Sequence, residues 1–150
     1  MIRVATLDDI DRIVELGCCL HAESSYGELP FDCDKVKHLM AGLIGGGYGV
    51  VFVAEKAGEI IGGIAGGVTE FWFCDELHGF DYSFFVHPEH RGGSAAFRLL
   101  LAFESWCKNM GAKQMDIGIT TGIHVDKTTR FYEKMGFVKS GQLFRKVLEE

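Results

Sequence analysis

The sequence predicts an α/β (α+β) fold in which a mixed sheet carries helices on both faces. Three observations lead to it: strand-like and helix-like segments alternate, a tight turn joins two of the strands, and glycines end the helices. The predicted order is β-α-α-β-β-β-α-β-α-β, without linker or repeat. Alternation of this kind places helices against both sides of one sheet. We therefore expect a single domain over residues 1–150, a length that suits one hydrophobic core.

The first part of the chain is expected to form a short strand at residues 2–5 and then two helices. Thr6 is a good helix N-cap, and Asp9 stands three residues later, where its carboxylate can bond back to the cap. Apolar residues then recur at helical spacing. A second helix is expected over residues 33–43, before the three glycines 45–47.

The middle of the chain is expected to form three strands. Residues 50–54 are rich in β-branched side chains, and the tight turn at 57–59 makes the next strand, 60–73, pair antiparallel to them. A third strand runs over residues 81–86 and stops before Pro88. Glycines inside the second strand indicate bends or a close approach of another backbone. They are Gly62, Gly63, Gly66 and Gly67.

The last part of the chain alternates between helix and strand. A long helix is expected over residues 93–110, and a strand follows at residues 114–119. A shorter helix spans residues 126–135 and ends at a glycine, which is a natural C-cap. From Phe137 onward we expect a final strand, or a hairpin around Gly141.

The composition argues against several classes of protein. The net charge is −6 and no dense Lys/Arg cluster is present, whereas a nucleic-acid partner calls for a basic face. Five cysteines without a Cys-x-x-Cys pair argue against a disulfide framework or a structural zinc site. No apolar run is long enough to cross a bilayer, and the acidic N-terminus is unlike a secretory signal. We expect a cytoplasmic protein without a metal ion, a nucleic-acid partner or a membrane partner.

The segment before the long helix is suited to hold an anion. Arg91 supplies a fixed positive charge, and five small residues follow it at the helix start. Free N–H groups and the positive end of the helix dipole lie there, and small side chains let a phosphate reach them. The alternative is a merely tight connection, because short glycine motifs are weak signals. The five residues are Gly92, Gly93, Ser94, Ala95 and Ala96.

Two segments of the chain fit longer motifs. Val86, Pro88, Arg91 and the small residues after them fit the pattern V-x-P-x-x-R-G-x-G-x-G/A, and residues 131–137 fit F-Y-x-K-x-G-F. The opening residues 2–6 and the spacing between the two motifs also fit. Together these features resemble the GNAT superfamily of N-acetyltransferases, and the resemblance spans the whole chain.

Two positions depart from the superfamily's pattern. Ser94 stands where the family most often has its central glycine, but serine is small and its backbone N–H remains available. Val125 stands where many members have an asparagine near the start of the last helix. The second departure removes a polar contact to the cofactor's pantetheine arm or to the thiolate.

The resemblance implies a GNAT-like mixed, mostly antiparallel sheet and an acetyltransferase that uses acetyl-CoA. The pantetheine arm would lie in a V-shaped gap between the strand that ends at Val86 and the strand at residues 114–119. The pyrophosphate would bind the N–H groups of residues 91–96, and an N–H near Val86 would polarise the thioester carbonyl. The implied cofactor-binding residues are Phe85, Val86, Arg91, Gly92, Gly93, Ser94, Ala95, Ala96 and Phe131.

Acetyl transfer to an amine needs a neutral amine, a donor to the developing oxyanion and a proton for the departing thiolate. Tyr132 matches the family's usual proton donor, and its phenol is neutral near pH 7. The alternative for Tyr132 is a core or cofactor-stacking role. Asp81 is the first candidate for the base, Glu70 is the second, and a water chain is the third. Further candidates are Asp75, His21, Glu23 and His124.

The acceptor, an amine of a small molecule or of a protein, is expected between the helix–helix connection and the aromatic loop 71–76. Aromatic faces together with carboxylates suit an ammonium group. Phe71 and Phe73 could instead be core residues, and an exposed Trp72 could be a homodimer contact. A rival interpretation is a non-catalytic acyl-CoA-binding or sensing module on the same fold. The connection contributes Glu23, Ser24, Ser25, Tyr26, Glu28 and Phe31.

Overall fold

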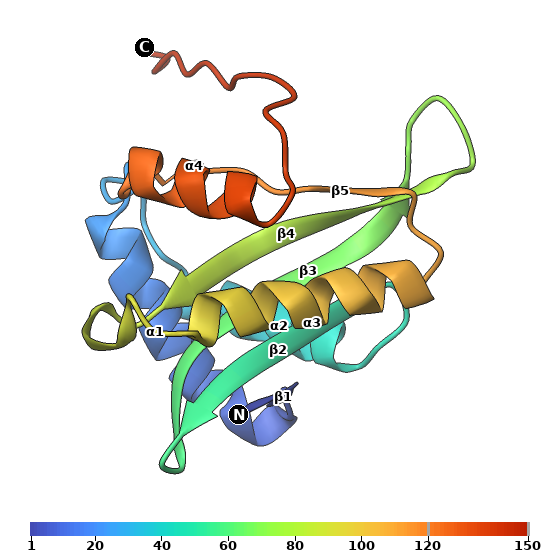
Figure 1. The fold of residues 1–150 in the computed structure, drawn as a ribbon. Helices are drawn as coiled ribbons and strands as arrows, with labels where there is room; N and C mark the ends of the chain where they lie inside the picture. Colours follow the sequence, from blue (N-terminus) through green and yellow to red (C-terminus); the bar gives the residue numbers. More distant parts are fainter. Residues whose placement is uncertain (120, 150) are drawn as a thin grey trace.

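A computed structural model describes residues 1–119 and 121–149, and Figure 1 shows the arrangement of its helices and strands. The predicted order of elements is confirmed from the first strand to the last helix. The elements are β1 (Ile2–Val4), a 3-10 turn (Leu7–Asp9), α1 (Ile10–Glu23), α2 (Cys33–Ile44), β2 (Gly49–Lys56), β3 (Glu59–Glu70), β4 (Leu77–Val86), a second 3-10 turn (Pro88–His90), α3 (Ala95–Asn109), β5 (Gln114–Asp116) and α4 (Val125–Lys134).

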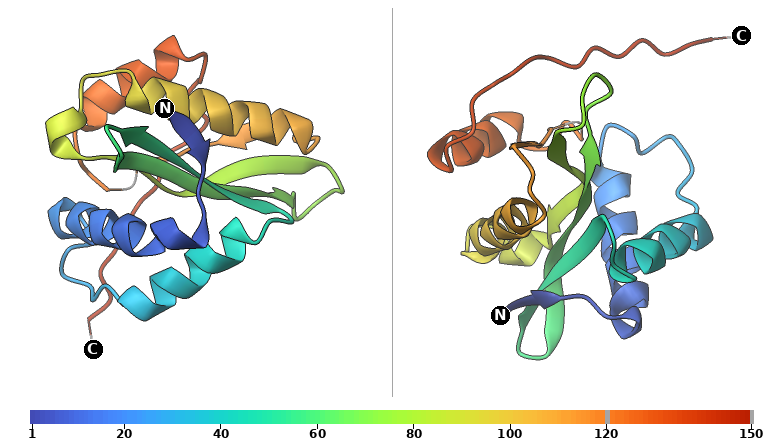
Figure 2. Two further views of the ribbon diagram at one scale, coloured as in Figure 1. Left: turned by 90° about the horizontal axis from the view of Figure 1, so that it is seen from below. Right: turned by 90° about the vertical axis from the view of Figure 1, so that its right-hand side faces the viewer.

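The five strands form one sheet in the order β1-β2-β3-β4-β5. The pairings from β1 to β4 are antiparallel, and only β4 and β5 run parallel. Helices α1 and α2 cover one face, and α3 and α4 cover the other (Figure 2). The predicted mixed, mostly antiparallel sheet with helices on both faces is therefore confirmed. No helix in the described part of the chain is long and apolar enough to span a membrane.

Each face of the sheet has its own hydrophobic core. On one side, Ile64 of β3 and Val86 of β4 pack with Leu99 and Phe103 of α3. On the other side, Ala65 of β3 and Phe85 of β4 pack with α1 and α2. Neighbouring residues of a strand point to opposite faces. Each central strand therefore contributes to both cores.

The start of the helical region is fixed by the capping arrangement that the sequence predicted. The Asp9 carboxylate accepts a hydrogen bond from the Thr6 backbone N–H at 2.8 Å. It also accepts two from the Arg3 guanidinium, at 2.7 and 3.0 Å. These bonds lower the pKa of Asp9 to about 2. The 3-10 turn before α1 is thus tied to β1 by a paired carboxylate.

The glycines of β3 allow close packing against β4 and α3, as predicted. A Cβ at Gly66 would stand 2.2 Å from the Phe80 carbonyl oxygen and 2.8 Å from the Phe103 ring. A Cβ at Gly62 would stand 2.7 Å from the Phe85 carbonyl oxygen. Only glycine fits these two positions without a shift of the backbone.

A β-bulge in β4 changes which side chains face which core. Ser83 pairs with Ala65, whereas Asp81 pairs with Gly66, so Tyr82 is an extra residue between the two pairs. Cross-strand partners share a face. Asp81 therefore shares the α3 side of the sheet with Gly66. Tyr82 and Ser83 both line a cavity on the α1 side.

Several strand boundaries differ from those predicted. The expected strand 60–73 ends at Glu70, the strand 81–86 begins earlier, at Leu77, and the strand 114–119 pairs only as far as Asp116. The residues between β3 and β4 form a loop that projects from the end of the sheet (Figure 1). Because Glu70 pairs with Leu77, these strands form a longer hairpin with a shorter loop than expected.

The prediction of a final strand or hairpin around Gly141 is wrong. Residues 137–149 adopt neither helix nor strand and extend away from the sheet (Figure 2). A strand needs a partner edge for its backbone N–H and C=O groups. The nearest strand in sequence, β5, has only three residues. The apolar side chains Leu143 and Phe144 are consequently exposed.

Candidate active site

The site is built where β4 and β5 separate. Their pairing ends at Phe80 and Asp116, and β4 continues to Val86 while the chain after β5 leaves the ladder. The backbone N–H of Gly118, beyond the last pair, donates a hydrogen bond to the Asp81 carboxylate. The two strands therefore stop pairing where the V-shaped gap is predicted to begin. The edge of β4 toward this gap is not paired by β5 beyond Phe80.

Asp81 directly follows the last β4 residue that pairs with β5, and the pKa of its carboxyl is shifted. Burial raises the pKa of its carboxyl to about 6, although the hydrogen bond from Gly118 acts in the opposite direction. A carboxyl with this pKa is ionised at neutral pH and can accept a proton from a substrate. Its position on the α3 side also brings its charge near Tyr132.

Tyr132 projects from α4 toward the same gap. Burial raises the pKa of its phenol, and the nearby Asp81 charge raises it further. The ring packs beside Phe131 and Phe137, with ring centroids 5.8 and 5.6 Å away. The phenol therefore keeps its proton at neutral pH, as a proton donor must. The structure brings the two predicted catalytic residues together from elements far apart in the sequence.

The predicted anion-binding segment joins β4 to α3. Gly92 has a positive φ of 94°, and α3 begins at Ala95 with Ser94 as its N-cap. The first N–H groups of a helix have no partner within it. A cavity of about 390 Å³ adjoins this segment, and its lining includes Arg91, Ser94 and Arg98 together with Glu55 and Glu89. Two arginines therefore lie near the start of α3, and two carboxylates share the same cavity.

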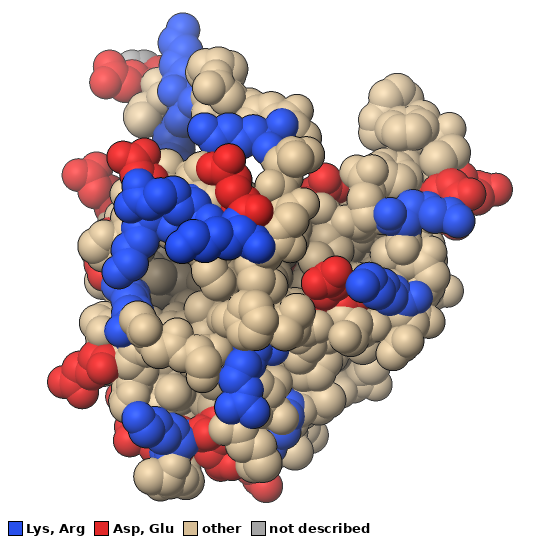
Figure 3. Space-filling view, in the orientation of Figure 1, with Lys and Arg blue, Asp and Glu red and all other residues tan. Residues whose placement is uncertain are grey.

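Arg91 is held at both ends of its side chain. Its Nε donates to the Val86 carbonyl oxygen at 2.9 Å, and its Nη2 donates to the Glu23 carboxylate at 2.5 Å. The guanidinium thus links the end of β4 to the end of α1. The basic side chains of α4 add further positive charge, and Figure 3 shows Lys and Arg gathered over that helix. They are Lys127, Arg130 and Lys134.

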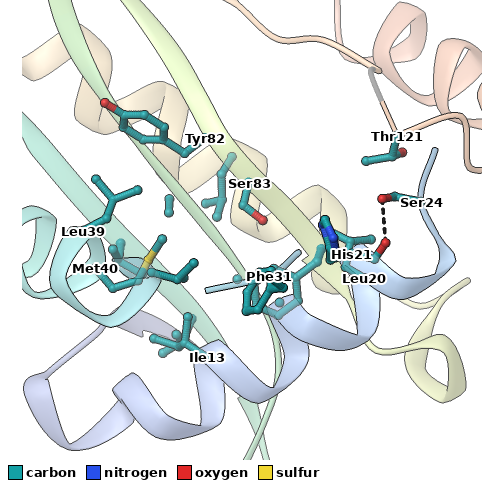
Figure 4. A pocket seen from close by; sticks show the side chains of 18 of the residues that line it. Ile13, Leu20, His21, Ser24, Phe31, Leu39, Met40, Tyr82, Ser83 and Thr121 are labelled. Atoms are coloured by element: carbon teal, nitrogen blue, oxygen red, sulfur yellow. Dashed lines mark hydrogen bonds between the residues drawn. The ribbon is translucent and has the colours of Figure 1, made fainter. Parts of the chain in front are cut away.

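A second cavity, of about 290 Å³, lies on the opposite face of the sheet, between the sheet and helices α1 and α2. At one end lie His21, Ser24 and Thr121, and at the other lie apolar side chains such as Leu39 and Met40 (Figure 4). We call it the α1–α2 cavity. Its lining includes Phe85 of β4. The next residue, Val86, is the last of the strand and precedes the anion-binding segment.

The polar end of the α1–α2 cavity lies beside the segment that follows β5. The Ser25 backbone N–H donates to the Thr121 carbonyl oxygen at 2.6 Å, which joins the end of α1 to the segment after β5. His21 Nε2 lies 2.6 Å from the Leu29 carbonyl oxygen, and the His21 ring packs near Phe31. A donor role for Nε2 would leave Nδ1 as the acceptor. His21 therefore stays one of the further candidates for the base.

Other predicted site residues lie elsewhere. Glu70 is exposed at the hairpin end of β3, four residues beyond Gly66, the partner of Asp81; this is about 13 Å along the strand. None of the α1–α2 cavity's described lining residues comes from the loop 71–76, where Trp72 is 94% exposed. His124 is exposed at the start of α4. The structure does not bring these residues together with Tyr132.

Four residues of the site were missed by sequence reasoning. Tyr82, Ser83 and Thr121 line the α1–α2 cavity, and the Gly118 N–H binds Asp81. For Ser83 a signal existed, because a polar residue directly before the apolar run Phe84–Val86 of a strand needs a partner or a function. The contribution of Gly118 comes from the backbone, which its residue type does not reveal.

Comparison with known proteins gives one family. The model of the acetyltransferase (GNAT) family matches residues 19–137. No match is found among the curated proteins.

Many solved structures share the fold. AAC(6')-Iy, an aminoglycoside N-acetyltransferase solved with the bisubstrate analog CoA-S-monomethyl-acetylneamine, is 18% identical with a TM-score of 0.78, over 99% of this chain and 97% of that one. A soil-metagenome aminoglycoside acetyltransferase, HMB0005, is 17% identical with a TM-score of 0.73, over 99% and 98%. An acetyltransferase from Trypanosoma brucei is 19% identical with a TM-score of 0.74, over 99% of each chain.

Proposed function

Because the chain belongs to the acetyltransferase (GNAT) family, we propose that it moves an acetyl group from acetyl-CoA to a primary amine by direct attack in a ternary complex. One observation carries this proposal: the unpaired edge of β4 has Asp81 and Tyr132 at one end and the anion-binding segment at the other. An acetyl donor with an extended arm and a phosphate group would bind its phosphate at the anion-binding segment and its reactive end beside Asp81 and Tyr132.

The residues along the gap fit the parts of acetyl-CoA. The pantetheine amides would pair with the free edge of β4 near Phe85 and Val86, as an added strand does. The pyrophosphate would bind the N–H groups of residues 92–96, with Arg91 beside it. Phe131 would pack along the arm. Ser94 keeps its backbone N–H, so its difference from glycine does not remove a donor.

Asp81 and Tyr132 divide the proton transfers between them. Because Asp81 lies on the α3 side of the sheet, it removes a proton from the acceptor ammonium through a water chain, and the neutral nitrogen then attacks the thioester carbonyl. A backbone N–H near Val86 stabilises the negative oxygen that develops. The carbon–sulfur bond breaks, and Tyr132 gives its proton to the departing thiolate. The products are an acetamide and free coenzyme A, and no metal ion takes part.

Thiol release from acetyl-CoA in the presence of a panel of primary amines tests this function. We expect release that depends on the amine, and a chelator should leave the rate unchanged. The rival interpretation, a non-catalytic acyl-CoA sensor, predicts a higher melting temperature with acetyl-CoA but no release above the background of the Tyr132→Phe variant. An unchanged melting temperature at saturating acetyl-CoA would exclude both functions.

We also propose a homodimer and a cytoplasmic location. Support for the dimer comes from the aromatic tip of the β3–β4 loop, where Trp72 and Phe73 are exposed, because exposed apolar surface often marks an interface. Sedimentation equilibrium should give twice the monomer mass of 16.6 kDa, and Trp72→Ser should reduce it. Support for the cytoplasm comes from the free thiols of exposed cysteines such as Cys18 and Cys74, which suit a reducing compartment.

A further inference from the structure

The α1–α2 cavity has a lining without charged side chains. Among its described lining residues there is no Asp, Glu, Lys or Arg. Two candidate carboxylates of the site lie outside the cavity: Glu23 binds Arg91, and Asp81 lies on the other face of the sheet. A ligand group inside this cavity would therefore meet no opposite charge.

Most of the polar groups lie at one end of the cavity, although Ser83 lies midway along it and Tyr82 lies beside Leu39 (Figure 4). His21, Ser24 and Thr121 lie together where the end of α1 meets the segment after β5 (Figure 4). The deeper part is formed by aliphatic and aromatic side chains, including Ile13 and Phe31. A ligand that fits both parts has one polar end and one apolar end.

The position of the polar part relates the cavity to the reaction. It lies at the end of α1, and the same end of α1 binds Arg91 through Glu23, beside the end of β4. Phe85 lines the cavity from β4, directly before Val86. An amine held among the polar side chains would thus be next to the strand that receives the donor.

The cavity has a volume of about 290 Å³, which suits a small ligand. Burying an additional unpaired ammonium group in an apolar lining is strongly unfavourable. Charge therefore disfavours a ligand with several ammonium groups.

We propose that the α1–α2 cavity binds the side chain of the acceptor, and that the acceptor is a small primary amine with one uncharged, apolar or aromatic substituent. This rests on the proposed acetyltransferase function and specifies its substrate. It differs from the acceptor class of the aminoglycoside acetyltransferases that share the fold, because aminoglycosides carry several amines on polar sugars.

The test is a comparison of kcat/KM across four amines at saturating acetyl-CoA. 2-Phenylethylamine and hexylamine represent apolar acceptors, and spermidine and kanamycin represent polycationic ones. We expect kcat/KM to be at least about 10-fold higher for the apolar pair, which is the discrimination that an apolar pocket gives. Equal values, or a preference for the polycations, would overturn the inference.

A pair of helix variants links the preference to the cavity. Gly17 of α1 lines it, and a Cβ there would be 3.5 Å from the Phe31 ring, an ordinary contact. Gly17→Leu therefore places a side chain in the cavity. Gly42 of α2 has no atom within 4 Å of its Cβ position and is not among the lining residues, so Gly42→Leu is the matched control. Both exchanges replace a helix glycine by a better helix former.

The two variants should differ in kinetics and not in folding. We expect Gly17→Leu to lower kcat/KM for 2-phenylethylamine by about 10-fold or more, while Gly42→Leu matches the wild type. Equal kinetics in the two variants would overturn the assignment of the cavity. If Gly17→Leu does not fold, the amine comparison on the wild type still decides.

Failure of the proposed function gives a different result. In that case none of the four amines releases thiol from acetyl-CoA. A wild type that acetylates the polycations alone keeps the proposed function and overturns only this inference.

Discussion

The Asp81 carboxylate on β4 lies close enough to the Tyr132 phenol on α4 for its charge to raise the pKa of that phenol. The two side chains are 51 residues apart in the sequence, and they meet where β4 and β5 separate. One is an anion at neutral pH, and the other keeps its proton. This pairing of a proton acceptor with a proton donor leads to the first three predictions.

Replacing Asp81 should change the pH dependence of the reaction. The wild-type carboxyl has a pKa of about 6, so a base at this position is protonated below that pH and active above it. We expect the wild-type rate to rise as the pH increases through 6. Asp81→Asn should lower kcat by at least about 10²-fold and should lose this rise with pH. A pH–rate profile measures both. A variant that keeps this rise would direct attention to His21 or to a water chain that does not end at Asp81.

The same variant should be more stable than the wild type at neutral pH. The Asp81 carboxyl ionises at 3.8 when unperturbed and at about 6 in the folded protein. Its contribution to stability is therefore fully present below pH 3.8 and is lost as the pH rises through 6. We expect Asp81→Asn to gain about 1–3 kcal/mol at pH 7.5 and little at pH 4. Urea unfolding at both pH values measures this, and an equal gain at both would contradict it.

Tyr132→Phe should separate chemistry from binding. Phenylalanine keeps the ring packing against Phe131 and Phe137 but cannot donate a proton. We expect kcat to fall by about 10²-fold, with the affinity for acetyl-CoA unchanged by calorimetry. Tyr48→Phe is the control, because Tyr48 is 69% exposed and lies outside both cavities. Wild-type kcat in Tyr132→Phe would mean that the ring only packs.

Replacing the two partners of the Arg91–Glu23 ion pair should change the Kd for acetyl-CoA in opposite directions. Arg91→Ala removes a charge beside the anion-binding segment, and we expect Kd for acetyl-CoA to rise about 10-fold. Glu23→Gln frees the guanidinium from its present partner, so Kd should fall. Arg12→Ala, which removes an arginine paired with Glu59, controls for net charge. A rise in Kd on Glu23→Gln would contradict this account.

A methyl group at Gly66 should destabilise the sheet. The added Cβ would stand 2.2 Å from the Phe80 carbonyl oxygen and 2.8 Å from the Phe103 ring, so backbone or core must move. We expect Gly66→Ala to lower the free energy of unfolding by about 2–3 kcal/mol. Gly42→Ala, in open space, should not lower it. Thermal or urea unfolding of the two variants provides the measurement.

Local signals made much of the fold predictable from the sequence. Thr6 and Asp9 mark the first helical turn because the Asp9 carboxylate accepts hydrogen bonds from the Thr6 backbone N–H and hydroxyl, three residues away. The turn at Ala57 and Gly58 sets β2 and β3 antiparallel, and both residues have positive φ. The glycines of β3 were predicted to allow close approach, since a missing Cβ has few other uses inside a strand.

What the sequence could not predict depends on partners far along the chain. A strand after Phe137 was expected from its apolar residues, but pairing depends on an edge that β5 does not extend to it. The loop 71–76 was placed at the acceptor pocket because of its aromatic and acidic residues, but its location follows from the length of the β3–β4 hairpin. The α1–α2 cavity combines residues from seven segments, so no single stretch of the sequence predicts it.

The extra residue in β4 makes the site depend on the parity of the strand. In a regular strand, Asp81 and Val86 have opposite parity and would point to opposite faces. Because Tyr82 is an extra residue in the strand, the alternation shifts by one, and both Asp81 and Val86 face the side with α3. Deletion of this one residue would turn the strand before it by half a period and move Asp81 away from Tyr132. The spacing of β4 is thus as important to the site as the identity of its residues.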